Sequence, residues 1–181
     1  MFERCGAHVL YADSLARTIS DNDPIVKQAI LRLLGSASYR TDGSLNREYV
    51  ALQIFSDKQL QKKLNAILHP RVEQELMTRM EQLSARRVPF VFIEAALIYE
   101  AGLDKILDAV VVVDADEDVR VQRVVDRDGV EPQQVRKRMK AQWSQQKKLQ
   151  RAEYVIRNNG SLRDLERRVK FLFNLFSQLY H

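Results

Sequence analysis

The sequence predicts an α/β fold built on a mostly parallel sheet. Strand-like and helix-like segments alternate along the 181 residues, which is the order of parallel strands joined by helical crossovers. In the segment 107–114 the β-branched residues are clustered and continuous and do not alternate with polar ones, which is typical of a parallel strand covered on both faces. No internal repeat and no linker rich in proline, glycine or serine divides the sequence, so we expect one domain over residues 1–181.

Four segments are predicted to be strands. They cover residues 8–13, the beginning of 89–98, then 107–114 and 153–158. Ligands bind beyond the carboxyl ends of parallel strands, so residues near positions 13, 94–96, 114 and 158 are the first candidates for chemistry.

The segments between these strands carry apolar residues at helical spacing. Helices are predicted over 24–34, 46–55, 57–68, 70–86, 116–127, 131–142 and 162–179. We expect His69-Pro70 to start a helix, because proline suits the first helical position. The last helix is strongly amphipathic, and we interpret its stripe as core; the stripe comprises Leu165, Val169, Leu172, Phe173 and Phe176.

The charge balance predicts an anionic partner. The formal net charge is +5, and the basic excess gathers in one segment, at Arg136, Lys137, Arg138, Lys140, Lys147, Lys148 and Arg151. Either a nucleic acid backbone or the phosphates of a nucleotide would satisfy this excess. Trp143 is the only aromatic residue inside the segment, so the stacking platform of a single-strand binder is absent and nucleic acid is the less favoured partner.

Composition also restricts the setting. No apolar run reaches the roughly 18 residues that span a bilayer, and the first residues lack the basic-then-apolar order of a signal peptide. The single cysteine, Cys5, cannot form an internal disulfide. We therefore expect a cytoplasmic protein without a membrane partner. The three histidines and one cysteine have no spacing typical of a zinc site.

Two carboxylates are candidates for catalysis or metal binding. Asp13 ends the first predicted strand, with Arg17 one helical turn later, and it either faces a substrate hydroxyl as a base or caps a helix that begins at Ser14. Glu94 interrupts an apolar strand and needs a partner, which is either Mg²⁺ through its water shell or a structural lysine or arginine.

Other polar residues are ambiguous when taken singly. Tyr99 and Glu100 follow the second strand, where Glu100 either contacts a ligand or is solvated, and His69 is either a ligand-binding residue or part of a helix start. Arg123 and Arg127 share a helix face before an Asp128-Gly129 turn. Arg138 and Gln142 repeat that spacing, which suits a flap closing over phosphates or an ordinary solvated face.

Taken together and in order, these segments resemble the dephospho-CoA kinase family over nearly the whole chain. The resemblance rests on 6–17 (GAHVLYADSLAR), 41–47 (TDGSLNR), 64–70 (LNAILHP) and 96–103 (ALIYEAGL), and then on 111–114 (VVVD), Arg123, Arg127-Asp128, Arg138, Gln142 and 156–158 (IRN).

The resemblance implies a three-layer parallel sheet with helices on both faces, of the P-loop kinase type. It implies ATP-dependent phosphorylation of the 3'-hydroxyl of dephospho-CoA, with ATP and Mg²⁺. Asp13 would be the acid near the acceptor hydroxyl, Arg17, His69, Tyr99 and Glu100 would line the acceptor region, and Asn158 would lie toward the adenine. Arg123, Arg127, Arg138 and Gln142 would lie in a lid over 117–149. A helical acceptor-substrate region would cover 21–88, and the core would cover 1–20, 89–116 and 150–181.

Three departures from the family pattern stand out. Tyr11 replaces an aspartate and Ala96 replaces a proline, while Asp13 is retained. The 181 residues contain no GxxxxGK[ST] loop, the glycine-rich turn that wraps nucleotide phosphates. We expect that loop and the first central strand, roughly 20 residues, to lie upstream of Met1, and a start at an internal methionine explains the gap more simply than loss.

The missing segment leaves the chain without a nucleotide site and without a buried strand, so we expect it to be poorly folded and inactive by itself. Two alternatives remain open from the sequence. One is a non-catalytic protein that binds CoA-like ligands or nucleic acid on a degenerate kinase scaffold, and the other is a different small-molecule P-loop kinase.

Overall fold

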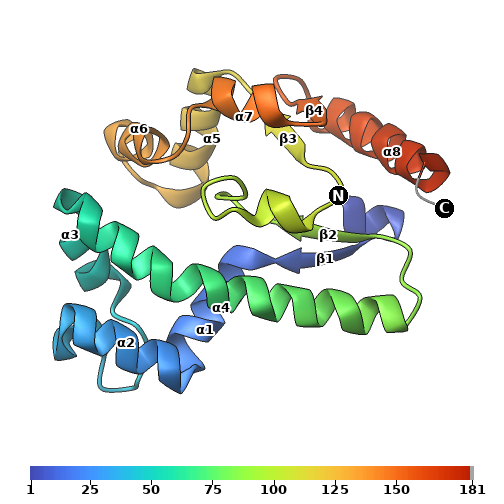
Figure 1. Ribbon diagram of the computed structural model, residues 1–181. Coiled ribbons are helices and arrows are strands. Elements are labelled where there is room, and N and C mark those ends of the chain that lie inside the picture. The colour runs from blue at the N-terminus through green and yellow to red at the C-terminus, as the bar shows by residue number, and fades with distance from the viewer. Residues whose placement is uncertain (180–181) are drawn as a thin grey trace. The chain divides into compact units, whose positions relative to one another are not determined.

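The computed structural model describes residues 1–179 and divides the chain into two compact units (Figure 1). The central unit is His8–Ala96, and the terminal unit joins Met1–Ala7 to Leu97–His181. The fold is α/β with parallel strands, as the sequence predicts. The described strands do not form one sheet, however, since each unit contains its own pair.

The central unit is built on two parallel strands, β1 (His8–Tyr11) and β2 (Val91–Glu94), paired so that Tyr11 lies beside Glu94. Four helices connect the strands: α1 (Ala12–Asn22), α2 (Pro24–Leu34), α3 (Arg47–Ser56) and α4 (Lys58–Ala85), with the 3-10 turn η2 (Ser36–Ser38) after α2. Parallel strands need such a crossover, because the chain must return to the same end of the sheet.

Aspartates and an asparagine set the starts of three of these helices. The Asp23 carboxylate accepts hydrogen bonds from the backbone N–H groups of Ile25 and Val26 at 2.9 and 3.1 Å, with Pro24 at the first helical position. Asn46 caps α3 and Asp57 caps α4 in the same way. These caps satisfy backbone donors that the helix itself leaves unpaired.

The prediction of two helices over 57–68 and 70–86 is wrong, because α4 runs through Pro70 without a break. His69-Pro70 therefore lies inside a 28-residue helix and starts none. Proline removes one intrahelical hydrogen bond, but α1, α2 and α3 all pack on α4, and its buried residues Leu64, Val72 and Leu76 lie on both sides of the proline. Tertiary packing outweighs the local preference.

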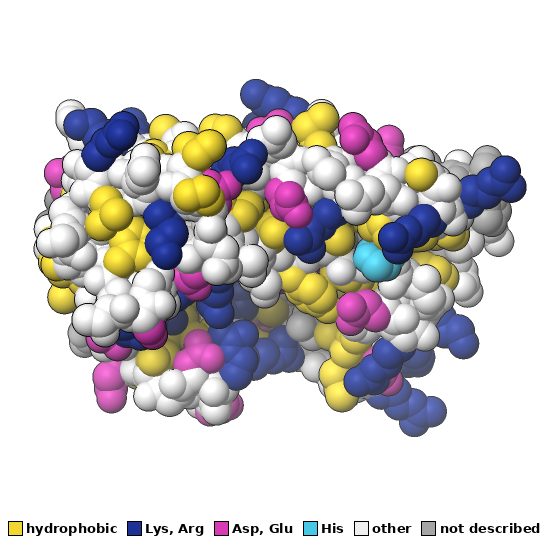
Figure 2. Space-filling view, turned by 90° about the horizontal axis from the view of Figure 1, so that it is seen from below, with side chains coloured by type: hydrophobic (Ala, Val, Ile, Leu, Met, Phe, Trp, Pro, Cys, Tyr) yellow, Lys and Arg dark blue, Asp and Glu magenta, His cyan; other side chains and the backbone are white. Residues whose placement is uncertain are grey.

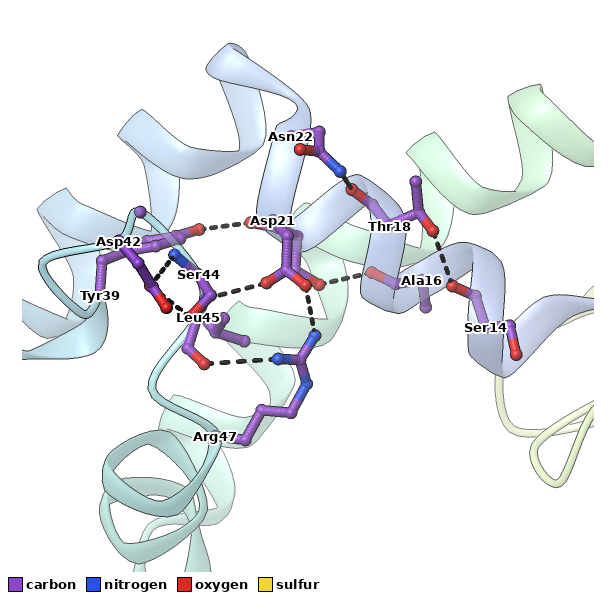
Figure 3. A network of polar contacts seen from close by, with 12 residues as sticks. Ser14, Ala16, Thr18, Asp21, Asn22, Tyr39, Asp42, Ser44, Leu45 and Arg47 are labelled. Carbon is purple, nitrogen blue, oxygen red and sulfur yellow. Dashed lines mark hydrogen bonds and ion pairs between the residues drawn. The ribbon is translucent and has the colours of Figure 1, made fainter.

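A polar network fastens the segment before α3 to the end of α1 (Figure 3). The Asp21 carboxylate accepts the Leu45 N–H at 2.9 Å and forms an ion pair with Arg47 at 2.7 Å. The Tyr39 hydroxyl donates to the Ser20 carbonyl at 2.9 Å, and Tyr39 and Leu45 form an antiparallel bridge. The 41–47 segment is therefore held as a closed turn against α1.

The terminal unit contains a second parallel pair, β3 (Val111–Asp114) and β4 (Tyr154–Arg157). Three helices connect these strands: α5 (Glu117–Asp128), α6 (Pro132–Ala141) and α7 (Gln145–Arg151). The unit also contains α8 (Leu162–Leu179) and two 3-10 turns, η1 (Phe2–Cys5) and η3 (Leu103–Ile106). No helix among residues 1–179 is both long enough and apolar enough to cross a bilayer.

The last helix confirms its predicted bounds and its role in the core. The buried residues of α8 are Val169, Leu172 and Phe176, all on the predicted stripe, and Phe176 meets the Tyr154 ring edge-on at 4.9 Å. A second contact ties α8 to the N-terminus, where Arg4 pairs with Glu166 at 3.1 Å.

In the terminal unit, the predictions for the third strand are wrong and one helix was not predicted. The third strand begins at Val111 and not at Leu107, and it is not covered on both faces, since Val113 is 52% exposed. Helix α7 was not predicted, because seven residues are too few for a clear apolar period; its one signal is Ser144, whose hydroxyl accepts the Lys147 N–H.

The interior of the central unit suggests a matched test of stability. Ile30 and Ile25 both lie on α2, but Ile30 is 0% exposed and Ile25 is 72% exposed. Ile30→Ala should lower the free energy of unfolding by about 2–5 kcal/mol, because it leaves a cavity in the packed core. Ile25→Ala, the same chemical change on the same helix, should stay within about 0.5 kcal/mol of the parent.

Urea unfolding followed by circular dichroism at 222 nm measures both variants. Equal losses for the two isoleucines would contradict the packing of α2 described above.

Candidate functional site

The carboxyl ends of β1 and β2 bring two acidic residues together. Tyr11, the last residue of β1, pairs with Glu94, the last residue of β2, and Asp13 follows Tyr11 by two positions. The negative charge of Asp13 acts on Glu94, whose pKa is raised first by burial and then by that charge. Two carboxylates thus share one edge of the central unit, the edge at which parallel sheets bind ligands.

The structure corrects two details of these carboxylates. Asp13 is not the end of a strand, because α1 already begins at Ala12, and it does not cap a helix at Ser14, since the N-cap residue is Tyr11, which makes no side-chain cap bond. The Glu94 residue as a whole is exposed, because β2 ends there, and only its carboxyl group is partly desolvated, which raises its pKa. Asp13 lies in the first turn of α1, where the helix dipole favours a negative charge.

Arg17 and His69 lie on helices of the same unit. Arg17 is exposed, one turn after Asp13 on α1, so the two side chains share a face of that helix. His69 is half-buried in α4, and this burial lowers the pKa of its imidazole. A neutral His69 can accept or donate a hydrogen bond without carrying charge near neutral pH.

The predicted lid arginines lie on two helices that form a hairpin. Helix α5 ends at Gly129, whose φ of 65° is the left-handed conformation that glycine adopts readily, and α6 packs back against α5. Arg123 and Arg127 lie on α5 and Arg138 lies on α6. The predicted turn at Asp128-Gly129 is thereby confirmed.

Asp128 joins two of these arginines. The Arg127 guanidinium donates to both Asp128 oxygens, at 2.7 and 3.0 Å, and Arg138 approaches the same carboxylate at 3.9 Å. The hydrogen bond from Arg127 lowers the pKa of the Asp128 carboxyl. All of these groups are solvent-facing, so the contacts hold the arginines loosely and an incoming anion can replace Asp128 as their partner.

Asn158 lies just after β4 and contacts the start of the lid. Arg123 donates to the Asn158 carbonyl at 2.7 Å, and the Asn158 N–H donates to the Asp114 carbonyl at 2.6 Å. Gln142 caps the end of α6 and is exposed. The structure thus brings Arg123 to Asn158, while Gln142 follows the last residue of α6.

Tyr99 and Glu100 lie in the terminal unit and make internal contacts. Glu100 accepts the Trp143 backbone N–H at 2.8 Å and forms an ion pair with Lys148 at 3.1 Å. Tyr99 is 7% exposed and its ring stacks on Trp143, with ring centres 5.9 Å apart. Burial raises the pKa of the Tyr99 hydroxyl.

The basic segment has many acidic partners of its own. Arg136 pairs with Glu117 and Asp118, and other members pair as follows: Arg138 with Asp128, Lys148 with Glu100, and Arg151 with Asp104. Basic and acidic side chains are also interspersed on the face shown in Figure 2, which is the lower side of Figure 1. This pairing reduces the charge available to a nucleic acid backbone.

Sequence reasoning did not identify the partners of two residues that shape the terminal unit, Asp114 and Trp143, although it placed position 114 among the strand ends to consider. Asp114 is 4% exposed, forms an ion pair with Arg157 and accepts the Gln145 amide at 2.9 Å. Trp143 was noted only as an aromatic residue among charges. A buried acid at the end of an apolar strand is a usable signal for Asp114, whereas no local pattern marks the partners of Trp143.

Comparison with known proteins gives consistent matches. The family model described as "Dephospho-CoA kinase" matches residues 1–164. Proteins named dephospho-CoA kinase are 39% identical in Salinibacter ruber and 41% identical in Syntrophotalea carbinolica. These alignments cover 94% and 90% of this chain and 86% and 77% of the relatives.

Solved structures agree in fold. A crystal structure from Thermus thermophilus matches with a TM-score of 0.79 at 34% identity, over 99% of this chain and 88% of that one. A dephospho-CoA kinase from Campylobacter jejuni matches with a TM-score of 0.70 at 21% identity, over 97% and 88%.

The proximity of the two carboxylates can be tested by titration. Asp13→Asn should lower the pKa of Glu94, because it removes the neighbouring negative charge while leaving burial unchanged. NMR of the labelled glutamate carboxyl carbons measures that pKa. Asp108→Asn, which removes a carboxylate in the terminal unit, is the control; an equal shift in both variants, or none in either, would contradict the pairing.

Proposed function

Because the chain belongs to the dephospho-CoA kinase family, we propose that it supplies the acceptor site, the base and the lid of an enzyme that phosphorylates the 3'-hydroxyl of dephospho-CoA with ATP. The observation that supports this proposal is the Asp13 carboxylate, which follows the last residue of β1 by two positions in a chain whose residues 1–164 match the family. The reaction needs a positioned hydroxyl, a proton acceptor and charge stabilisation, and little other chemistry.

In this proposal Asp13 is the base. Its exposed carboxylate can accept a hydrogen bond from the sugar hydroxyl and take its proton as the oxygen attacks the γ-phosphorus of ATP, whose bond to the departing ADP oxygen breaks. Arg17 and His69, from α1 and α4 of the same unit, are proposed to contact the acceptor. The neutral state of His69, favoured by burial, suits hydrogen bonding to a neutral group.

The arginines of the α5–α6 hairpin are proposed to bind the transferring phosphate. Arg127 and Arg138 now share Asp128, so a phosphate entering the lid would exchange one anion for another with little loss of contact. Arg123, next to Asn158, would contribute a third positive charge. Such charges stabilise the transition state when they are already in place.

The carboxylate pair suits Mg²⁺. Mg²⁺ binds one or two carboxylates and completes its shell with water and substrate phosphates. Burial is the main cause of the raised Glu94 pKa, and a cation beside Asp13 and Glu94 would relieve the second cause, the repulsion between the two carboxylates. Among the described residues, no group of three or more His, Cys, Asp or Glu side chains gathers as a site. When bound, the ion would neutralise charge on the phosphates.

The nucleotide site is incomplete in these 181 residues, since the sequence contains no GxxxxGK[ST] motif. We therefore propose that turnover requires the strand and loop that carry this motif. The test is a loop-bearing chain, made by adding a strand and a GxxxxGK[ST] loop before Met1.

The loop-bearing chain should convert dephospho-CoA to coenzyme A with ATP, detected by liquid chromatography and mass spectrometry, whereas the 181-residue chain should not. A lysine-to-alanine change in the added loop should abolish product and serves as the control. Turnover by the 181-residue chain alone would refute the requirement, and failure of a folded loop-bearing chain would refute the function. Preference for nucleoside monophosphates would instead favour another kinase activity.

The role of Asp13 is tested in the same loop-bearing chain. Asp13→Asn should lower kcat by about 10²–10⁴-fold, the usual contribution of a general base, while ATP binding measured by calorimetry should be kept. Asp108→Asn is the control for loss of a carboxylate. Unchanged turnover in Asp13→Asn would remove Asp13 from the mechanism.

A further inference from the structure

The connection that follows α6, the second helix of the lid hairpin, is attached to Glu100. Helix α6 ends at Ala141 and α7 begins at Gln145, so Trp143 lies in the short connection between them. The Trp143 N–H donates to Oε1 of Glu100 at 2.8 Å, across 43 positions of sequence. Lys148, on α7, pairs with the same oxygen at 3.1 Å. One carboxylate oxygen therefore holds both the connection, through Trp143, and the helix that follows it, through Lys148.

This attachment is shielded from water. The side chains of Glu100 and Lys148 are 15% and 13% exposed, so their attraction is screened less than that of a surface pair. Oε2 of Glu100 is buried without a hydrogen-bond partner in the described structure, and the carboxylate is thus engaged through Oε1 alone. Charged hydrogen bonds of this kind are among the stronger ones in proteins.

Aromatic stacking fixes the tryptophan from the side. The Tyr99 and Trp143 rings are within 6° of parallel, and Tyr99 itself is buried. The Lys147 ammonium lies 3.3 Å from the centre of the Trp143 ring, and the Arg151 guanidinium lies over both rings. Stacking and cation contacts restrict the ring, while Glu100 restricts the backbone.

The first helix of the hairpin, α5, and the residue before it have different attachments. The Asp116 N–H donates to the side chain of Asn159 at 2.8 Å, and Arg123 donates to the Asn158 carbonyl at 2.7 Å. The hairpin α5–α6 is therefore fastened at its beginning by residues that follow β4 and at its end by Glu100. Arg138 and Gln142 lie five residues and one residue before Trp143.

We infer that Glu100 is a positioning residue, which sets the place of Arg138 and Gln142 through Trp143 and does not itself contact the acceptor. This inference departs from the acceptor-binding role that the family pattern suggests for Glu100. Its kinetic test rests on the proposed function, but its structural test does not.

The structural test uses the fact that Trp143 is the only tryptophan in the chain. In the 181-residue chain, Glu100→Ala should shift Trp143 emission to longer wavelength and increase its quenching by acrylamide. Glu100→Gln should stay close to the parent, because its amide oxygen still accepts the Trp143 N–H. Glu166→Ala, the same change at an exposed ion pair of the terminal unit, should leave the emission unchanged.

The kinetic test uses the loop-bearing chain. Glu100→Ala should lower kcat about 10- to 100-fold, the effect of misplacing groups by about 1 Å, and leave the KM for dephospho-CoA unchanged. Glu100→Gln should restore most of kcat. Acceptor binding by Glu100 would instead raise the KM for dephospho-CoA in both variants, and that result would overturn the inference.

The structural test and the kinetic test can fail independently of each other. An inactive loop-bearing chain refutes the proposed function, while the emission of the 181-residue chain still decides whether Glu100 holds Trp143. Unchanged emission in a folded Glu100→Ala overturns the inference whatever the kinetics. If Glu100→Ala does not fold by circular dichroism, Glu100→Gln decides: a raised KM with kcat retained overturns the inference, and parent-like values of both support it.

Discussion

Parallel pairing of strands is the constraint on which this structure depends. β1 pairs with β2, and β3 pairs with β4, and in both pairs the chain must cross from the end of one strand to the start of the other. The first crossover contains α1–α4 and the second contains α5–α7. The helices proposed to contact the acceptor and the helices proposed to cover the phosphates are therefore the two crossovers. The need for a crossover between parallel strands thus accounts both for the strand pairing and for the helices that carry the proposed site residues.

Local patterns predicted much of this fold. Helices α2 and α8 have the bounds that periodicity and caps indicate, because Pro24 and the buried stripe of α8 are local signals. The same reasoning failed at Pro70, where packing of three helices on α4 outweighs one lost hydrogen bond. It also placed Asp13 at a strand end, since the sequence does not show that α1 begins at Ala12. Local signals describe elements well and their junctions poorly.

The candidate site was less accessible from sequence. The residue types at Asp13, Arg127 and Arg138 suit their proposed chemistry, but nothing in spacing alone shows that Asp128 links the two arginines. The contact between Glu100 and Trp143 spans 43 positions and arises only when the segment after β2 meets the connection between α6 and α7. Charge counts did not show the pairing either, because Arg136, Arg138, Lys148 and Arg151 each have an acidic partner elsewhere in the sequence. Partnerships of this kind are properties of the tertiary structure.

The central unit is one uninterrupted stretch of chain, from His8 to Ala96. Two junctions in the gene therefore enclose β1, β2 and the four helices between them. A recombination event at those junctions would carry Asp13, Glu94 and the helix caps together, with their mutual contacts intact, and would leave the α5–α6 hairpin and its attachments unchanged. The proposed acceptor residues and the proposed phosphate-binding arginines can thus diverge as separate inheritable modules within this fold.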